Sequence, residues 1–317
     1  MTEPGYFQKL IKPITSQPTS NKNENSIVKE FNLKPGTLII FVDPKSIMED
    51  CYTGNLAPAI TKMSQWCFVP QGTGVTANAV HVAIVTDPNE QVNSTDSHAE
   101  KHQMIGPDNK PYKIVEVVAN GIHTNYLDGT RGIETFVLAP LDPTLSDEKQ
   151  RQLIAEQDQF LNILLNIINF FSQNAAKSKK NQIEYSIVNC VKSLIDRCDP
   201  APANLKEHVG EFVQTFEKEK SLRTFKKGFI CTEFAEYAIM AAAYLCFGSE
   251  GIKKVLDIDP ISSPISLQRC LYENKGWFCS GGVWMLNEGH PELISIKPVQ
   301  CCPDLDPKPK SEPKRKF

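Results

Sequence analysis

The chain has 317 residues, of which 41% are hydrophobic and 22% charged, and its net charge is -3 at pH 7. This composition is typical of a globular protein with one large domain or two small ones. The nearly balanced charge gives no reason to expect nucleic-acid binding along the whole length.

Ten cysteines are scattered through the sequence without a C-x-x-C pair. This spacing argues against a disulfide framework, a zinc ribbon or a thioredoxin-type redox site, and we expect neither a metal nor another cofactor. The first residues lack the apolar core of a signal peptide, and no apolar run approaches membrane-spanning length. We therefore expect a cytoplasmic protein, although export by a route without a cleaved signal leaves no trace in a sequence.

The first half of the chain predicts a sheet of short strands that follows a polar arm over residues 1–33. Five apolar runs bounded by turn residues predict strands over residues 34–43, 79–87, 112–119, 122–127 and 134–139. Asn120-Gly121 is typical of a tight hairpin between the third and fourth strands. Such short strands and tight turns favour an antiparallel, meander-like sheet. Between the first two strands we expect a helical piece over residues 57–68.

The second half predicts mainly helices. Thr144-Leu-Ser-Asp147 fits a helix start, and apolar residues then recur at helical spacing as far as Ile168. A polar break over residues 172–181 precedes a second helix over 183–195. The stretch from Gly228 to Gly248 is nearly apolar and predicts a central, buried helix.

The remaining C-terminal residues are more mixed. Residues from Ser263 suit a short helix with proline in its first turn. Residues 277–300 contain tryptophan and glycine, and we expect them to form a further strand. Residues 301–317 are rich in proline and basic residues, so this tail cannot form a core.

Cys231 opens the predicted central helix, where first-turn amides and the helix dipole favour a thiolate over a thiol. A cysteine nucleophile requires such a position. A small buried core residue would look the same in the sequence, and the core is the commoner fate of a free cysteine. Cys231 is thus a candidate nucleophile with a structural role as the alternative.

Two polar residues interrupt apolar strands. His81 lies within Ala-Val-His-Val-Ala, and Glu116 lies within Ile-Val-Glu-Val-Val. If the two strands are antiparallel neighbours, both side chains can share one face, and we expect the central helix to cover it. His81 would then take the Cys231 thiol proton, and Glu116 would fix the imidazole tautomer. The alternatives are a satisfied core histidine and a glutamate that faces solvent.

The order of these motifs resembles the circularly permuted papain-like hydrolases, specifically the YiiX-like branch of the NlpC-type superfamily. Lys34-Pro-Gly-Thr-Leu-Ile-Ile-Phe is similar to the first turn and strand of that family. His81-Val-Ala-Ile-Val and Ile114-Val-Glu-Val-Val resemble the two strands with polar residues, and Phe229-Ile-Cys-Thr-Glu-Phe resembles the nucleophile motif. Lecithin retinol acyltransferase-like proteins share this order. The resemblance covers about residues 34–140 and 228–275, and it implies Cys231 as nucleophile, His81 as general base and Glu116 as third polar residue.

We therefore predict an α+β, permuted papain-like fold with an antiparallel sheet packed on the nucleophile-bearing helix. The predicted parts are a polar arm (1–33), a β-rich half (34–142), a helical insertion or cap (143–227), a helical half (228–300) and a basic tail (301–317). The predicted activity is that of a cysteine hydrolase acting through an acyl-enzyme on the amide bond of a peptide or other amide-linked substrate.

Three alternatives stay open. An acyltransferase or lipid-directed thioesterase would act on an acyl-linked substrate and needs an apolar groove beside Cys231. A protein glutamine deamidase uses the same kind of site. A binding module without catalysis predicts that His81 or Glu116 turns away from Cys231.

Other polar residues give weaker signals. His98, His102 and His123 lie in or near loops without metal-ligand spacing, and Cys279, His290, Cys301 and Cys302 are a remote zinc possibility. We expect no nucleic-acid partner, and membrane contact is expected only through the basic tail, by weak attraction or by acylation of Cys301-Cys302. The sequence says nothing of the oligomeric state.

Overall fold

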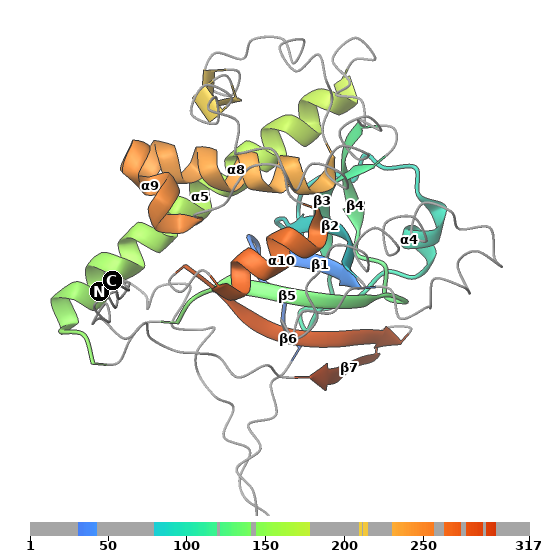
Figure 1. Cartoon of the computed structure of the whole chain (residues 1–317). Helices are drawn as coiled ribbons and strands as arrows, with labels where there is room; N and C mark the ends of the chain where they lie inside the picture. The colour runs from blue at the N-terminus through green and yellow to red at the C-terminus, as the bar shows by residue number, and fades with distance from the viewer. Residues whose placement is uncertain are drawn as a thin grey trace, which may run out of the picture.

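The structure is a computed structural model that describes residues 31–42, 79–118, 121–140, 144–177, 209–210, 212–214, 230–256, 263–273, 277–287 and 290–295. The predicted helices over residues 57–68 and 183–195 and the basic tail lie outside the described residues, as does nearly all of the polar arm. Within the described part the fold is mixed α+β, as the sequence predicts (Figure 1).

Seven antiparallel strands form one sheet in the order β4-β3-β2-β1-β5-β6-β7. Their bounds are β1 Leu38–Val42, β2 Ala79–Val85, β3 Lys113–Val118, β4 Gly121–Tyr126, β5 Gly132–Leu138, β6 Phe278–Asn287 and β7 His290–Ser295. All five strands predicted in the first half are present. The meander holds for β1 to β4, whereas β5 returns to the other side of β1. Residues 277–300, where one strand was expected, contain the β6–β7 hairpin.

Five helices are described in full: α4 Ser97–Lys101, α5 Asp147–Lys177, α8 Cys231–Phe247, α9 Ser249–Val255 and α10 Pro264–Glu273. The central helix begins and ends where the sequence predicts. Gly248 stops α8 with a φ of 71°, a conformation that glycine adopts without the strain of a side chain. Helix α5 continues through the first part of the expected break at 172–181 and ends at Lys177.

Successive residues of β1 point to opposite faces of the sheet and so contribute to two cores. Leu38 and Ile40 pack in the larger core with α5, α8, α9 and α10, whereas Ile39 and Phe41 pack in the smaller core on the other face. Figure 1 shows the helices of the larger core gathered on one side of the sheet. Helix α8 is therefore enclosed on most sides, as its nearly uniform apolar sequence requires.

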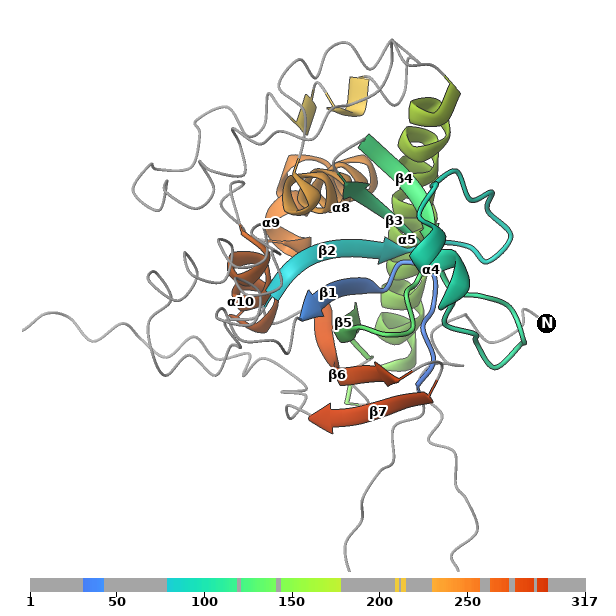
Figure 2. The ribbon, with the colours of Figure 1, turned by 90° about the vertical axis from the view of Figure 1, so that its right-hand side faces the viewer.

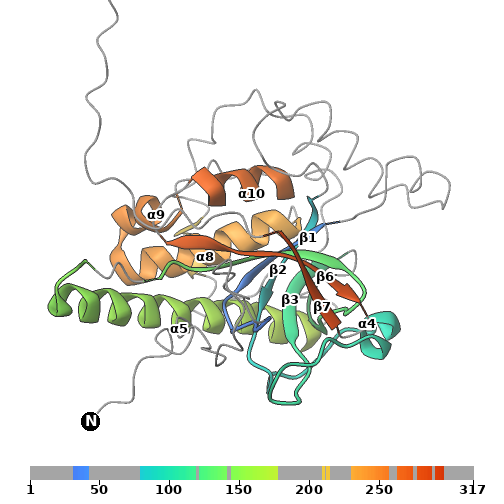
Figure 3. The same cartoon turned by 90° about the horizontal axis from the view of Figure 1, so that it is seen from below.

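Helix α5 lies beside α8 along much of its length (Figure 3). Phe160, Leu164 and Phe171 of α5 are fully buried in the larger core together with residues of the sheet and of α8. Residues 144–177, which we expected to begin an inserted cap, thus pack as part of the main core. The domain boundaries themselves stay a prediction.

Candidate active site

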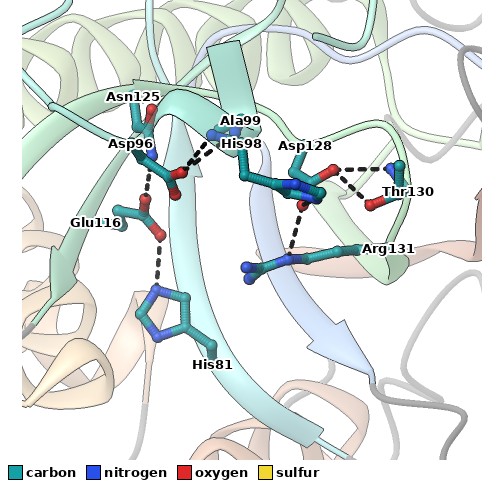
Figure 4. A network of polar contacts seen from close by, with 9 residues as sticks. All are labelled: His81, Asp96, His98, Ala99, Glu116, Asn125, Asp128, Thr130 and Arg131. Carbon is teal, nitrogen blue, oxygen red and sulfur yellow. Dashed lines mark hydrogen bonds and ion pairs between the residues drawn. The ribbon is translucent and has the colours of Figure 1, made fainter. Parts of the chain in front are cut away.

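The register between β2 and β3 brings His81 and Glu116 together. Ala83 pairs with Glu116, and His81 lies two residues before Ala83, so both polar side chains are on the same face of the sheet. The imidazole Nε2 of His81 lies 2.8 Å from Oε2 of Glu116 (Figure 4). The other carboxylate oxygen, Oε1, accepts a hydrogen bond of 3.0 Å from Nδ2 of Asn125 on β4. The Glu116 carboxylate is therefore fixed at both of its oxygens.

Cys231 is the first residue of α8, and its side chain is buried. Glu233 accepts a hydrogen bond of 3.1 Å from the backbone N–H of Ile230, which precedes the helix, and this contact fixes the first turn. The Cys231 thiol lies beside the His81 side chain and the backbone of Val82 on β2, and both lower its pKa. Its Sγ also lies 3.9 Å from Oγ1 of Thr232.

The expectation that the central helix covers the face bearing His81 and Glu116 is wrong. Both residues share the face of Phe41 and Ala83, in the smaller core, whereas α8 packs in the larger core on the opposite face.

The end of strand pairing explains how the start of α8 still reaches His81. The β2–β3 pairs begin at Ala83 and Glu116, so the earlier residues of β2, including His81 and Val82, lie beyond the ladder with β3. Figure 2 shows α8 nearly end-on, above β2 and beside β3. The start of α8 contacts β2 there, and the ring nitrogen of His81 that does not bind Glu116 is the one left for Cys231.

The three groups shift one another's pKa values toward an ion pair. Burial raises the pKa of the Cys231 thiol, but the His81 charge and the hydrogen bonds to the sulfur outweigh it, and the net shift is downward. Burial alone lowers the pKa of His81, but the neighbouring thiolate and carboxylate reverse this and raise the pKa to about 10. Burial opposes the charge of Glu116 too, but His81, Asn125 and Arg131 lower its pKa. The favoured state is thus thiolate, imidazolium and carboxylate.

A fourth ionisable group, Glu236, lies on the same helix beyond Cys231. Its side chain is completely buried, and among the described residues neither carboxylate oxygen has a hydrogen-bond partner. Burial, followed by the charges of Glu233 and Cys231, raises the pKa of Glu236 well above its ordinary value. Burial at this place therefore favours the protonated form of the Glu236 carboxyl.

A pocket of about 160 Å³ lies on the side of His81 and Glu116 away from α8. Its lining includes Phe41, His81, Asp96, Glu116, Asp128 and Arg131. Cys231 contacts His81 from the helix side, so the imidazole has the thiol on one side and this largely polar pocket on the other. The His81 side chain keeps 17% of its surface exposed, against 8% for Glu116.

The pocket contains a second polar network, centred on Asp128 (Figure 4). Asp128 Oδ1 accepts hydrogen bonds from the backbone and the hydroxyl of Thr130, and Oδ2 lies 3.1 Å from Nε of Arg131. His98 Nε2 lies 3.5 Å from the same Oδ2 atom. Asp96 caps the short helix α4 by accepting from the backbone N–H groups of His98 and Ala99.

The structure brings together all three residues that the sequence singled out: Cys231, His81 and Glu116. It also adds Asn125, Phe41 and Arg131 around them, which sequence reasoning missed. Asn125 lies two residues after His123 and so on the same face of β4, but nothing in that pattern indicates a partner for Glu116. Phe41 and Arg131 reach the site only through the packing of β1 between β2 and β5.

The other candidates do not form a site. The rings of His98 and His102 lie against each other at a tilt of 40°, with centroids 4.6 Å apart, and His123 is buried with no hydrogen-bond partner among the described residues. Cys279 lies near the start of β6, whereas His290 begins β7 and pairs with Asn287 at the other end of β6, and Cys301 and Cys302 are outside the described residues. In the part of the chain that the structure describes, no group of three or more His, Cys, Asp or Glu residues could hold a metal ion.

The fold and the geometry together define an α+β protein with a cysteine, a histidine and a glutamate in contact at the start of a buried helix. No family model, curated protein or solved structure matches this chain. None of the described helices has both the length and the apolar composition needed to cross a membrane.

Proposed function

We propose that this protein is a cysteine hydrolase that forms an acyl-enzyme on Cys231. The observation that carries the proposal is the hydrogen bond of 2.8 Å between His81 Nε2 and Glu116 Oε2, made by an imidazole that also contacts the Cys231 thiol. A nucleophile beside a base that is itself oriented by a third group is the general arrangement of nucleophilic catalysis.

In the proposed first step, the Cys231 sulfur attacks the carbonyl carbon of an amide. The C–S bond forms while the carbonyl π electrons move to oxygen. The tetrahedral intermediate then expels the amine as the C–N bond breaks, and the His81 imidazolium gives its proton to the departing nitrogen. Glu116 keeps the imidazole oriented throughout.

In the second step, water attacks the thioester carbonyl and the neutral imidazole of His81 takes its proton. The C–S bond breaks, the carboxylic acid leaves, and the thiolate–imidazolium pair is restored. In this proposal the backbone N–H of Cys231, in the first turn of α8, stabilises the oxyanion in both steps, because first-turn N–H groups have no partner within the helix.

The permuted papain-like fold is part of the same proposal. The strands that carry His81 and Glu116 precede the Cys231 helix in the chain, and that helix packs on the sheet. This chain order agrees with the order of motifs in the YiiX-like hydrolases that the sequence resembles.

The resemblance to the YiiX-like hydrolases favours amide hydrolysis over the lipid-directed alternatives. The acyltransferase or thioesterase alternative needs an apolar groove beside Cys231, and the polar pocket beside His81 does not test it, because Cys231 is not part of its lining. Deamidation of a protein glutamine uses the same three residues with ammonia as the leaving group. The closing experiment therefore includes both peptide and glutamine substrates.

The test is the pH dependence of alkylation at Cys231, read by peptide mass spectrometry in the intact protein. A paired thiolate is expected to label with an apparent pKa of about 3.5–7.5, against about 8.5 for a free thiol. Cys246 provides an internal control near the other end of the same helix, because burial raises the pKa of its thiol to about 11. His81→Ala should remove the early labelling of Cys231 and leave Cys246 unchanged.

Labelling of Cys231 only at high pH or only after unfolding would identify it as a core residue and support the binding module instead. Early labelling is followed by a screen of peptide amides and glutamine-containing peptides. Release of an amine or of ammonia by the wild type, lost in Cys231→Ala, then identifies the bond that is cleaved.

A further inference from the structure

The polar pocket of about 160 Å³ beside His81 has no part in the reaction as proposed so far. In the first step the His81 imidazolium gives its proton to the departing nitrogen, so the leaving group must lie against this imidazole. Cys231 reaches the imidazole from the helix side, and the pocket borders it on the other side. The pocket is therefore a candidate subsite for the leaving group.

Arg131, just before β5, places a fixed guanidinium in the wall of this pocket. Its Nε lies 3.1 Å from Oδ2 of Asp128, and its Cζ lies 5.3 Å from the centroid of the Phe41 ring, a cation–π distance. Asp128 is only 5% exposed and is itself held by Thr130. The same Phe41 ring lies 5.5 Å from the His81 imidazole, centroid to centroid. A buried carboxylate and an aromatic ring thus hold the guanidinium near the general base.

The two terminal nitrogens of Arg131 are open to a ligand. Among the described residues they have no hydrogen-bond partner, because Asp128 is bound through Nε. Figure 4 shows them turned away from Asp128, toward the side of His81 and Glu116. The open end of a guanidinium binds a carboxylate through two parallel hydrogen bonds. The Arg131 side chain is 48% exposed, so a ligand can approach it from solvent.

The other charges favour a ligand that carries a positive group beside its carboxylate. The carboxylates of Glu116, Asp128 and Asp96 all line the pocket. Glu116 is matched by His81 and Asp128 by Arg131. Asp96 accepts two backbone N–H bonds through Oδ1, and its Oδ2 has no partner in the described part of the chain. Phosphate would add to this excess of negative charge, whereas a group with both an ammonium and a carboxylate balances it.

The volume of the pocket limits the ligand to a small molecule. An apolar protein cavity of about 150 Å³ holds benzene, so this pocket suits about six or seven non-hydrogen atoms. Free alanine and serine are of this size, and phenylalanine is larger. Ile114 and Val118 add apolar side chains to the lining, which suit a short side chain on the ligand.

We propose that the pocket beside His81 binds one small amino-acid residue through its carboxylate on Arg131, and that this residue is the leaving group at the C-terminus of the substrate. The leaving-group role rests on the proposed function, whereas binding in the pocket does not require Cys231. Hydrolysis breaks the C–N bond of the last peptide link and consumes one water. The acyl part is released as a carboxylate with the water oxygen, and the amino acid is released with both water hydrogens on its nitrogen, as an ammonium that suits Asp96.

The first experiment measures the binding of small probes to the Cys231→Ala protein, in which no turnover occurs. Ligand-observed NMR compares alanine and serine with phenylalanine, acetate and inorganic phosphate. We expect alanine and serine to bind at least about tenfold more tightly than the other three. Arg131→Gln, with circular dichroism to confirm the fold, should weaken alanine binding by about tenfold or more. Arg151→Gln, at an exposed position on α5, should leave it unchanged.

The second experiment uses the wild-type protein and depends on no variant. Peptides that end in alanine or serine are compared as free acids and as C-terminal amides, which lack the carboxylate. Mass spectrometry measures the release of the last residue. We expect this release to be at least about tenfold faster from the free acids.

The outcomes separate the inference from the proposed function. If neither alanine nor serine binds, or if both bind equally well to a folded Arg131→Gln protein, the inference is overturned, and early labelling of Cys231 still supports the hydrolase. Equal release from the two peptide forms, or none from either, overturns the leaving-group role. Absence of early labelling at Cys231 overturns the proposed function and the leaving-group role together, even where alanine binds.

Discussion

His81 and Glu116 are held 2.8 Å apart by the register of two neighbouring strands. Each residue is an interruption in an otherwise apolar strand, and the register of β2 and β3 places both on one face. A shift of one residue in this pairing would turn one of the two side chains to the other face. The sheet therefore sets the geometry of the pair, and the start of α8 adds the thiol.

Glu116→Gln tests the charge of the third residue while keeping its size. The amide can still accept a hydrogen bond from His81, but it no longer stabilises the imidazolium, so the thiolate–imidazolium pair should lose population to the neutral thiol and imidazole. We expect the alkylation rate of Cys231 at neutral pH to fall about tenfold. Asn125→Ala should give a smaller change in the same direction, because it removes one hydrogen bond to the carboxylate. An unaltered profile for Glu116→Gln would contradict a role for its charge.

Glu236→Gln tests the cost of a buried carboxyl. Because the pKa of Glu236 is raised in the folded state, the folded protein holds a proton that the unfolded chain releases above about pH 4.5. The contribution of the protonated Glu236 carboxyl to the free energy of unfolding is therefore fully present below about pH 4.5. It is lost as the pH rises toward the pKa of Glu236 in the folded state.

The Glu236→Gln variant should lack this slope. We expect the stability of the variant relative to wild type to be greater at pH 7 than at pH 5. Urea denaturation at both pH values measures this difference in the free energy of unfolding. Glu250→Gln on α9 is the matched control, because Glu250 is exposed and its replacement should not change the slope. Equal pH dependence in wild type and Glu236→Gln would show that Glu236 ionises in the fold.

Phe171→Ala tests whether α5 belongs to the main core. Phe171 is fully buried, with its ring stacked on Phe212 at 4.4 Å and edge-on to Phe234 of α8 at 6.2 Å. Its truncation should cost about 3–5 kcal/mol in the free energy of unfolding. The neighbouring Phe170 is only partly buried, so Phe170→Ala should cost less. Loss of α5 alone, with α8 still folded, would indicate an independent subdomain.

Gly132→Ala tests the close approach of β1 and β5. A Cβ atom at Gly132 would lie 2.7 Å from the backbone oxygen of Val42, and backbone cannot move aside cheaply. We expect a loss of about 1–3 kcal/mol in the free energy of unfolding. A Cβ at Gly210 would meet nothing within 4 Å, so Gly210→Ala should be neutral or slightly stabilising. Similar values for the two variants would be inconsistent with the strand register.

The sequence predicts the local elements well where the pattern itself determines them. The apolar runs around Ile40 and Ile84 can only be buried strands, and the stretch ending at Gly248 is both apolar and closed by a residue suited to positive φ. Cys231, His81 and Glu116 could be chosen because each is a polar or reactive residue in an apolar segment. Their meeting required the β2–β3 pairing, which the sequence supports only as a hypothesis.

The remaining features depend on contacts between distant segments. Phe41 reaches His81, and Arg131 reaches Phe41, only because β5 pairs with β1 rather than continuing the meander beyond β4. Strand β6 of the β6–β7 hairpin contains Ser280-Gly-Gly, residues that disfavour a strand when read alone. Glu236 looks like an ordinary helix residue until the surrounding elements bury it.

The two ends of α8 give its two cysteines opposite chemistry. Cys231 lies at the first turn, beside His81, and its pKa is lowered, whereas burial raises the pKa of Cys246 to about 11. Peroxides react with thiolates far faster than with thiols. A mild oxidant should therefore convert Cys231 to its sulfenic acid while Cys246 stays reduced, and a reducing thiol should reverse the modification.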